Sequence, residues 1–384
     1  MKPGALPIIA LLALLALLPA CQTPQVQRAP EISADLVAEG RKLIAAAPAK
    51  DKNLWAYQVA LLAMKQGRYA EAQELFGKHL PPAGALLRGG ASGQQSRSLF
   101  QPEGVKVFYG EPHERTMAWL YRGVLHWMDG EADNARACFR TAQLFDLSED
   151  SAHQSDWILL GYLDGLITSK LGGDGADALK RARANAGSRA LPEYDRAANV
   201  MVVLQYGFGP VKKSGGNHGE RLAWAGGHST VQAAVVRNGT KAVRAPVLDD
   251  VSFQASTRGL RRMDTVLAQK AGVKKVADVV GDVGVVPGLI LSQPAGTRDA
   301  GLVLLGAGLT GKAVGGSVEP RADTRTWNNL PQHLAFAALR LPAGRQRLTV
   351  DFYDADGQLL SDLSRTLELD VKPQGDTVVF VADK

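Results

Sequence analysis

The chain has 384 residues, more than one average hydrophobic core accommodates, so its length predicts two domains. Hydrophobic residues make up 46% and charged residues 21%, which is typical of globular proteins. The 44 basic and 38 acidic side chains leave a net charge of +6. This excess is too small and too scattered to indicate a nucleic-acid partner, and we expect none.

The first twenty residues have the pattern of an export signal. Lys2 precedes an apolar run from Leu6 to Leu18, which suits a signal peptide and is too short to span a bilayer comfortably. The run ends in Leu-Pro-Ala-Cys at residues 18–21, which resembles the lipobox of bacterial lipoproteins. In that motif the signal is removed before the cysteine and the thiol is acylated. The resemblance implies a signal peptide over 1–20 and lipid on Cys21. The alternative is an ordinary signal peptide followed by a chance cysteine.

The residues after the cysteine bear on location and stability. In enterobacterial lipoproteins an Asp directly after the cysteine favours inner-membrane retention, so Gln22 implies the periplasmic face of the outer membrane. Inner-membrane anchoring is the alternative. Residues 21–34 are polar and proline-containing, which predicts a tether. The second cysteine, Cys138, lies in an apolar helical pattern, so we expect it to pack in a core rather than act as a nucleophile.

Residues 35–198 are predicted to be helical. Residues 67–72 read Gly-Arg-Tyr-Ala-Glu-Ala, which resembles a tetratricopeptide repeat (TPR), in which a tight glycine turn joins two helices that pack through small residues. A third, degenerate copy is predicted from Trp157 to Ala186. The best copy lies between these two and has the spacing of the repeat at Trp119, Gly123, Gly130, Ala135, Phe139 and Ala142. A helical bundle without repeats is the alternative.

From residue 199 onward the pattern predicts β-structure. Asn238-Gly239 separates two apolar segments, as in a two-residue hairpin. Residues 333–384 alternate between apolar and polar, with a turn at Asp356-Gly357, and predict a small antiparallel sheet. Its last two strands are expected near 364–371 and 376–382.

The predicted organisation has four parts. A signal peptide (1–20) and a tether (21–34) precede a TPR-like helical domain (35–198), which is followed by an α+β domain (199–384). The fold class is therefore α+β, with an N-terminal TPR-like helical repeat module and a mixed β-rich C-terminal region that contains a small antiparallel sheet.

One glycine-rich segment carries a nucleotide-binding pattern that we discount. Gly306, Gly308 and Gly311 have the dinucleotide-binding spacing, and Gly311-Lys312 ends a partial P-loop. However, Ala313 stands where a P-loop needs Ser or Thr to hold magnesium, and no clean strand–helix–strand series surrounds it. The sequence also contains no HExxH, no GxSxG and no zinc-type Cys/His spacing. We therefore expect no cofactor and no metal.

Three short marks give the chain a family resemblance. Residues 110–115 read Gly-Glu-Pro-x-Glu-Arg and open a predicted helix, and residues 207–212 read Gly-x-x-Pro-x-Lys after a predicted strand. Residues 323–331 read Asp-x-Arg-x-Trp-x-x-Leu-Pro. On these marks the chain resembles a family of bacterial lipoproteins with tetratricopeptide-like helices. The resemblance implies a cell-envelope location and carries over no catalytic residue.

The marks supply the candidate residues for partner binding or for structure, which are Glu111, Arg115, Pro210, Lys212, Asp323, Arg325 and Trp327. Trp327 beside Arg325 suits a binding patch, because it places an aromatic platform next to a bidentate donor. We favour the alternative, in which Trp327 fills the interface between helices and sheet while Asp323 and Arg325 cap and pair.

The expected function is a non-enzymatic adaptor of the cell envelope. Stacked helix pairs form a concave surface suited to peptides or protein segments, and lipid holds that surface at the membrane. The expected partners are unidentified envelope proteins, and regulation of peptidoglycan or polysaccharide assembly is one form of this function. The alternative is a periplasmic ligand-binding protein or enzyme. It would use the glycine-rich loop 207–229, with His218, Glu220 and His228, or the region of Arg325 and Trp327.

Overall fold

The computed structural model describes residues 35–82, 107–146, 156–215, 221–257 and 323–383. The predicted signal peptide, the acylated Cys21, the tether and the Gly306–Lys312 segment lie outside the described residues. Residues Leu36–Lys384 belong to one compact unit. Among the described residues, no helix is both long enough and apolar enough to cross a bilayer.

The first half of the chain is helical, as the periodicity predicts. Consecutive helices pack as pairs, α3 with α4, α7 with α8 and α9 with α10. The described helices of this part are α2 (Leu36–Ala46), α3 (Lys52–Lys65), α4 (Tyr69–His79), α7 (Pro112–Met128), α8 (Ala132–Leu144), α9 (Ile158–Lys170) and α10 (Ala176–Ala186).

The first helix of each pair ends in the same glycine turn. Gly67, Gly130 and Gly172 have φ of 72°, 85° and 82°, the left-handed region that favours glycine. In each turn a backbone N–H just beyond the helix bonds to the carbonyl five residues back, as in Arg68 N–H to Ala63 O at 2.8 Å. This closure satisfies carbonyls that the helix end leaves without partners and turns the chain toward the next helix.

Small residues let the paired helices approach closely. A Cβ added at Gly123 of α7 would lie 2.5 Å from Cε1 of Phe139 in α8. A Cβ added at Gly165 of α9 would lie 2.5 Å from Cγ of Leu179 in α10. Both contacts place a large apolar side chain of the second helix against a glycine of the first, so side chains fill the gap without voids.

Two four-stranded sheets and one two-stranded ribbon are present among the described residues. The inner sheet has the order β10-β1-β7-β6, and the outer sheet has the order β5-β4-β8-β9. The inner strands are β1 (Val200–Tyr206), β6 (Val247–Asp250), β7 (His333–Leu339) and β10 (Thr377–Ala382). The outer strands are β4 (Ala233–Asn238), β5 (Lys241–Ala245), β8 (Gly344–Tyr353) and β9 (Arg365–Val371), and the ribbon is β2 (Val211–Gly215) with β3 (Arg221–Ala225). A short helix, α11 (Val251–Thr257), follows β6.

A small antiparallel sheet is present in the C-terminal region, as expected, but residues 333–384 do not form it by themselves. Strands β8 and β9 pair within the outer sheet, whereas β7 and β10 belong to the inner sheet, where β10 pairs with β1 in parallel. Alternating polarity reports which face of a strand is buried and not which strand lies beside it. The Asn238-Gly239 hairpin between β4 and β5 is present, with Asn238 opposite Lys241.

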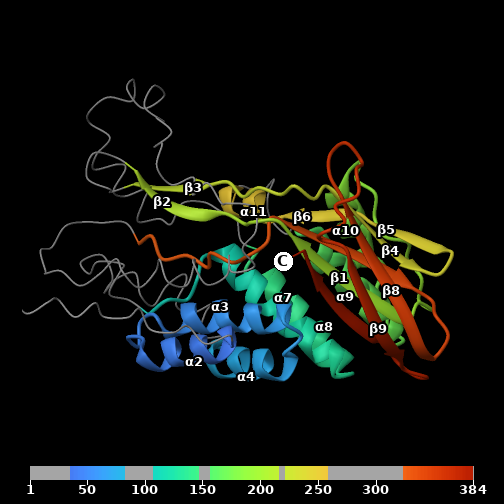
Figure 1. Cartoon of the computed structure of the whole chain (residues 1–384), viewed down its shortest axis with the longest axis horizontal. Helices are drawn as coiled ribbons and strands as arrows, with labels where there is room; N and C mark the ends of the chain where they lie inside the picture. The colour runs from blue at the N-terminus through green and yellow to red at the C-terminus, as the bar shows by residue number, and fades with distance from the viewer. Residues whose placement is uncertain (1–34, 83–106, 147–155, 216–220, 258–322, 384) are drawn as a thin grey trace, which may run out of the picture. The chain divides into compact units, whose positions relative to one another are not determined.

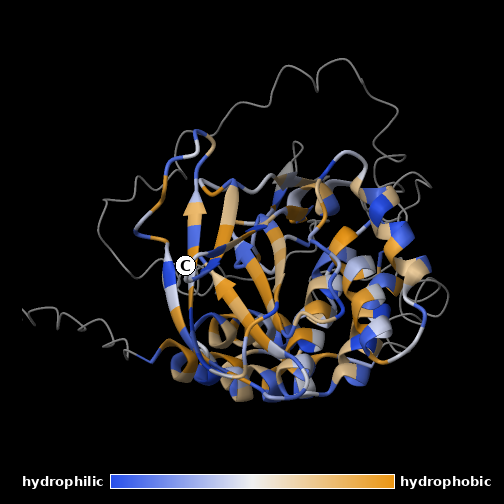
Figure 2. Ribbon diagram, turned by 90° about the vertical axis from the view of Figure 1, so that its right-hand side faces the viewer, coloured by the Kyte–Doolittle hydropathy of each residue, from blue (hydrophilic) through white to orange (hydrophobic). Residues whose placement is uncertain are grey.

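The inner sheet is buried on both faces. Along β1, Met201 and Val203 belong to the core shared with the helices, whereas Val200, Val202 and Leu204 belong to the core between the two sheets. This period-2 division means that helices, inner sheet and outer sheet form three layers, with the helices on one side of the sheet pair (Figure 1). Hydrophobic and hydrophilic residues alternate along several strands (Figure 2).

The first helix of each pair faces the inner sheet. Helices α3 and α7 contact β10, and α9 contacts β6 and β7. Every residue of α9 except Lys170 is buried, which explains why that helix is apolar all round. Polar bonds reinforce the contact, since Asp376 before β10 accepts from Trp127 Nε1 at 3.0 Å and Lys170 Nζ at 2.7 Å. The inner sheet therefore covers one side of the first helices.

Candidate functional site

The three marks, far apart in the sequence, meet in one cluster, which we call the buried junction: Glu111, Glu114, Lys212, Asp323 and Arg325. Glu111 and Glu114 lie at the start of α7, and Lys212 lies on β2. The Nζ of Lys212 donates to Oε1 of Glu111 at 2.6 Å, and the two side chains are only 1% and 8% exposed. This ion pair joins the ribbon β2–β3 to the helices inside the protein.

Glu114 links α7 to the extended segment 323–332. Its carboxylate accepts the N–H of Glu111 and the N–H of Trp327, each at 2.6 Å, and the hydroxyl of Thr326 at 3.2 Å. Pro112 occupies the first turn of α7, where its missing N–H is not needed. Burial raises the pKa of Glu114, and the charge of Lys212 opposes that rise.

Arg325 holds the same segment to the start of α3. Its guanidinium donates to Asp323 at 2.8 Å and to the carboxylate of Asp51 at 2.8 Å. It also donates to the carbonyl of Lys50 at 3.2 Å. Burial acts to raise the pKa of Asp323, but the hydrogen bonds and charge of Arg325 outweigh burial, so this pKa lies below its ordinary value. Arg325 is thus engaged on two sides within the protein.

Trp327 is completely buried. Its ring centroid lies 5.2 Å from that of Tyr57, 5.9 Å from that of Tyr121 and 6.2 Å from that of Phe76, which belong to α3, α7 and α4. Its indole N–H donates to Oδ1 of Asn329 at 2.6 Å. The burial contradicts an exposed binding patch at Arg325 and Trp327, and it fits the packing hypothesis, in which the aromatic ring fills a gap that helices alone leave open.

The other candidate residues, Pro210 and Arg115, are at least half-buried. Pro210 is buried, and the guanidinium carbon of Arg115 lies 5.3 Å from the ring centroid of Phe145. Gly209 donates its N–H to the carbonyl of Leu330 at 2.8 Å, and a Cβ there would lie 2.7 Å from the carbonyl oxygen of Pro331. Residue 209, one of the unspecified positions of the second mark, therefore needs to be glycine because the third mark passes directly against it.

The expectation that residues 207–229 form one glycine-rich loop is wrong for the described residues, which include two paired strands. Residues 211–215 and 221–225 pair as the antiparallel ribbon β2–β3, and Phe208 stacks on His228 with ring centroids 4.9 Å apart. His218 and Glu220 lie outside the described residues. Within the described ranges, no group of three or more His, Cys, Asp or Glu side chains has an arrangement that would hold a metal ion.

Sequence reasoning missed two aromatic contacts of the junction. Trp224 on β3 lies beside Lys212, with Nζ 5.8 Å from the ring centroid, and the ring of His113 meets that of Trp224 edge-on at 4.9 Å. A cation over an indole face is stabilised by the ring quadrupole. No local signal marks Trp224, because its partners lie on α7 and on the opposite strand.

A second buried carboxylate, Asp249 of β6, was also missed. It accepts the backbone N–H groups of Ile158 and Leu159, each at 2.9 Å, and so caps the N-terminus of α9 from the inner sheet. Burial raises the pKa of Asp249 to about 7, although the two backbone bonds oppose the rise. Cys138 is buried on the packed face of α8, and burial raises its thiol pKa to about 11, which favours packing over nucleophilic chemistry.

The junction joins layers rather than presenting reactive groups. Lys212 bonds to Glu111, Glu114 accepts from segment 323–332, and Arg325 is shared between Asp323 and Asp51. Apart from the bond between Arg325 and Asp323, which lies within segment 323–332, each of these bonds connects residues that are distant in sequence. The arrangement therefore supports a structural role for the candidate residues.

Removing one partner of the buried ion pair tests this role. Lys212→Met should lower the free energy of unfolding by about 3–5 kcal/mol, because Glu111 is then left buried without its cation. Lys213→Met, the matched control at an exposed neighbour, should change it by less than about 0.5 kcal/mol. Urea unfolding of the full chain measures both, and equal effects of the two substitutions would contradict the junction.

Asp249 predicts a pH dependence of stability. Its folded pKa of about 7 exceeds the ordinary value of 3.8, so its contribution is fully present below pH 3.8 and is lost as the pH rises toward 7. Compared with Asp249→Asn, the native chain should lose stability across that window, by at most about 1.4 kcal/mol per pH unit. Unfolding curves from pH 4 to 8 measure this, with the exposed Asp177→Asn as control. A pH-independent difference between Asp249→Asn and the native chain would refute it.

No protein-family model, curated protein or solved structure matches this chain. Function is therefore inferred from the chain's own residues and surfaces.

Proposed function

We propose that this protein is a non-enzymatic adaptor of the bacterial cell envelope, held at the periplasmic face of the outer membrane by acyl chains on Cys21. The observation that carries the proposal is the buried junction. Its charged residues fasten the helices, the ribbon and segment 323–332 together. A scaffold with such internal ties keeps its outer surface in a fixed shape, which a docking protein requires.

We further propose that the helix pairs are TPR-like and that the chain belongs to the lipoprotein family it resembles. Support comes from two recurring features. Gly67, Gly130 and Gly172 end the first helices of three successive pairs with the same turn. Gly123 and Gly165 form close contacts with the second helix in two of those pairs. A repeat array reuses one helix-turn-helix unit in this way.

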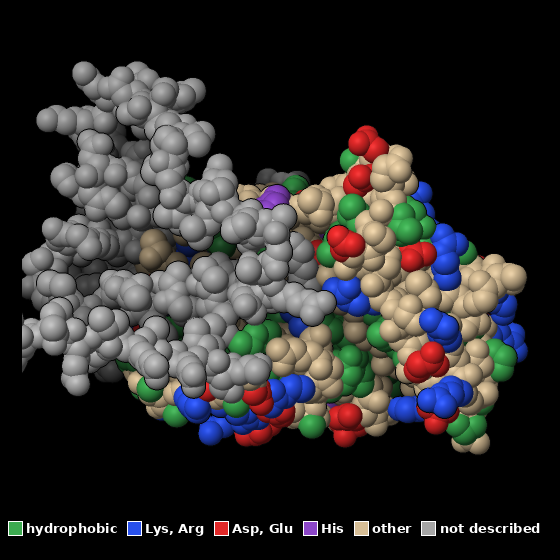
Figure 3. Space-filling model, in the orientation of Figure 1, with side chains coloured by type: hydrophobic (Ala, Val, Ile, Leu, Met, Phe, Trp, Pro, Cys, Tyr) green, Lys and Arg blue, Asp and Glu red, His purple; other side chains and the backbone are tan. Residues whose placement is uncertain are grey.

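The partner docks on the second helices in this proposal, because the first helices are covered by the inner sheet. Basic and acidic side chains are interspersed over α4, the second helix of the first pair, and over the neighbouring α2 (Figure 3). There Arg41 pairs with Glu74 at 2.7 Å and with Glu71 at 3.2 Å. Such a mixed, charged surface suits a reversible protein contact rather than a permanent hydrophobic one. Regulation of peptidoglycan or polysaccharide assembly is compatible with this arrangement.

In-cell crosslinking tests the adaptor. A photoreactive residue at Lys78 on α4, Ala137 on α8 or Arg181 on α10, all exposed, should yield a discrete adduct with an envelope protein. The same group at the exposed Glu368 on the outer sheet serves as the matched control and should yield none. Cys21→Ser should abolish fatty-acid labelling, release the protein from the outer-membrane fraction and remove the adduct.

Two results would contradict the proposal. An absence of discrete adducts from α4, α8 and α10 in the lipidated chain would reject the docking surface. Retained fatty-acid label and membrane fractionation in Cys21→Ser would reject the anchor. Cys138→Ala, at the second of the two cysteines, should keep the label and controls for a general loss of thiols.

A further inference from the structure

A hollow lies on the solvent-facing side of the outer sheet. We call it the outer-sheet trough, and the residues that shape it are Ala233, Val235, Arg237, Arg244, Tyr353 and Asp354. Its volume of about 450 Å³ lies within the range of roughly 300–1,000 Å³ that small-molecule sites occupy. The trough belongs to a part of the molecule that neither the buried junction nor the helices use.

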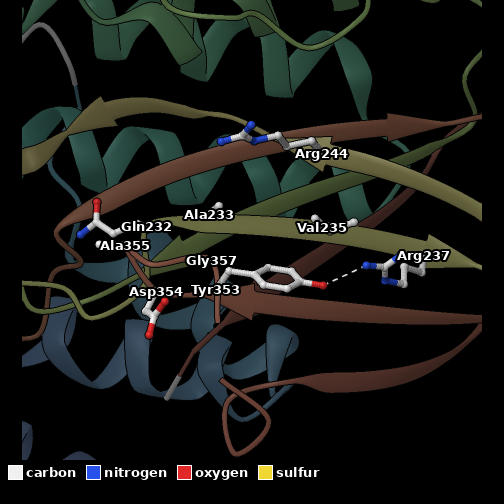
Figure 4. A pocket seen from close by; sticks show the side chains of 9 residues that line it. All are labelled: Gln232, Ala233, Val235, Arg237, Arg244, Tyr353, Asp354, Ala355 and Gly357. Atoms are coloured by element: carbon white, nitrogen blue, oxygen red, sulfur yellow. Dashed lines mark hydrogen bonds between the residues drawn. The ribbon is translucent and has the colours of Figure 1, made fainter. Parts of the chain in front are cut away.

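The strand register explains why the surface is hollow there. Ala233 lies opposite Tyr353 of β8, and Val235 lies between Arg244 of β5 and Asp351 of β8. Small side chains on the central strand are thus flanked by long side chains on both neighbouring strands. Figure 4 shows Ala233 and Val235 between Arg244 on one side and Tyr353 on the other. The result is an apolar floor with an aromatic wall and a cationic wall.

The aromatic wall is fixed in place. The Nη2 of Arg237 donates to the hydroxyl of Tyr353 at 2.8 Å, and Nε of Arg237 donates to Asp351 at 2.7 Å (Figure 4 draws the bond to Tyr353). The backbone N–H of Gln232 donates to the carbonyl of Tyr353 at 2.8 Å. Because Asp351 balances Arg237, this arginine serves to orient the ring, and a preoriented ring loses little freedom on binding.

The cationic wall is the guanidinium of Arg244, whose N–H donors are available to a ligand. Arg244 is exposed, and among the described residues its guanidinium group forms no hydrogen bond and no ion pair. A guanidinium carries five N–H donors in a planar fork that matches a carboxylate. At the end of the trough, Oδ1 of Asp354 accepts the N–H groups of Asp356 and Gln358 at 3.0 and 2.8 Å, which fixes the turn there.

The shape of the trough argues against a peptide strand as its occupant. A peptide that adds to a sheet needs unpaired backbone groups at an edge strand. The floor strand β4 is paired on both sides, with β5 and with β8, so it offers none. An occupant must therefore bind through its faces and its charged groups, not through a backbone ladder.

We propose that the outer-sheet trough binds a carboxylate-bearing saccharide of one or two rings. The C–H face of a sugar ring lies on the floor of Ala233 and Val235 and against Tyr353, and the carboxylate pairs with Arg244. This site goes beyond the adaptor function and does not depend on it. Loss of adducts from α4, α8 and α10 would leave the trough unaffected.

Titration calorimetry of the full-length protein with digalacturonate as the probe tests the site. The native chain should bind it with a Kd near or below about 1 mM, and the neutral disaccharide maltose should bind at least about tenfold more weakly. Arg244→Gln, which breaks no hydrogen bond among the described residues, should weaken digalacturonate binding by about tenfold or more. Val235→Phe fills the floor and should have a similar effect.

Arg345→Gln is the matched control, because Arg345 is an exposed arginine on β8 that does not line the trough. It should bind like the native chain. The proposal is overturned if digalacturonate does not bind, or if maltose binds as tightly. It is equally overturned if Arg244→Gln and Val235→Phe bind like the native chain, or if Arg345→Gln loses as much affinity as Arg244→Gln.

Discussion

The ion pair between Lys212 and Glu111 sets how the helices meet the β-structure. Both side chains are almost completely removed from solvent, and their charged atoms lie 2.6 Å apart. Two charges in such a place are tolerated only as partners, so the pair fixes one position of the ribbon against α7. Glu114 extends the connection to Trp327, whose ring then fills the aromatic space between α3, α4 and α7.

The buried junction holds the β-structure against the helices and so limits the surfaces on which a partner can bind. A free array of helix pairs offers the surface of its first helices, but here β10, β6 and β7 lie against α3, α7 and α9. The inner sheet in turn has apolar residues on both faces, because it separates the helices from the outer sheet. The second helices and the outer face of the outer sheet remain exposed among the described residues. The two proposals place an envelope protein on the first and a small acidic sugar on the second.

Local features could be predicted from the sequence, and long-range pairing could not. The turn at Asn238-Gly239 and the start of α7 at Pro112 follow from backbone preferences of a few neighbouring residues. Parallel pairing of β10 with β1 has no such signal, because alternation shows burial but not the neighbouring strand. Of the five residues of the buried junction, the candidates from the sequence included Glu111, Lys212, Asp323 and Arg325 but not Glu114. The contacts of Asp51 and Trp224 with the junction were also missed. Their meeting depends on residues more than a hundred positions apart, as in the pair of Lys212 and Glu111.

The most direct measurement of whether helices and sheets form one joined body is hydrogen–deuterium exchange across a urea series. If the junction couples the layers, the core amides of α7 and of β10 should exchange through the same opening, with the same free energy and the same dependence on urea. Exchange of α7 at a clearly lower free energy, while β10 stays protected, would show that the helices open on their own and would contradict the coupling.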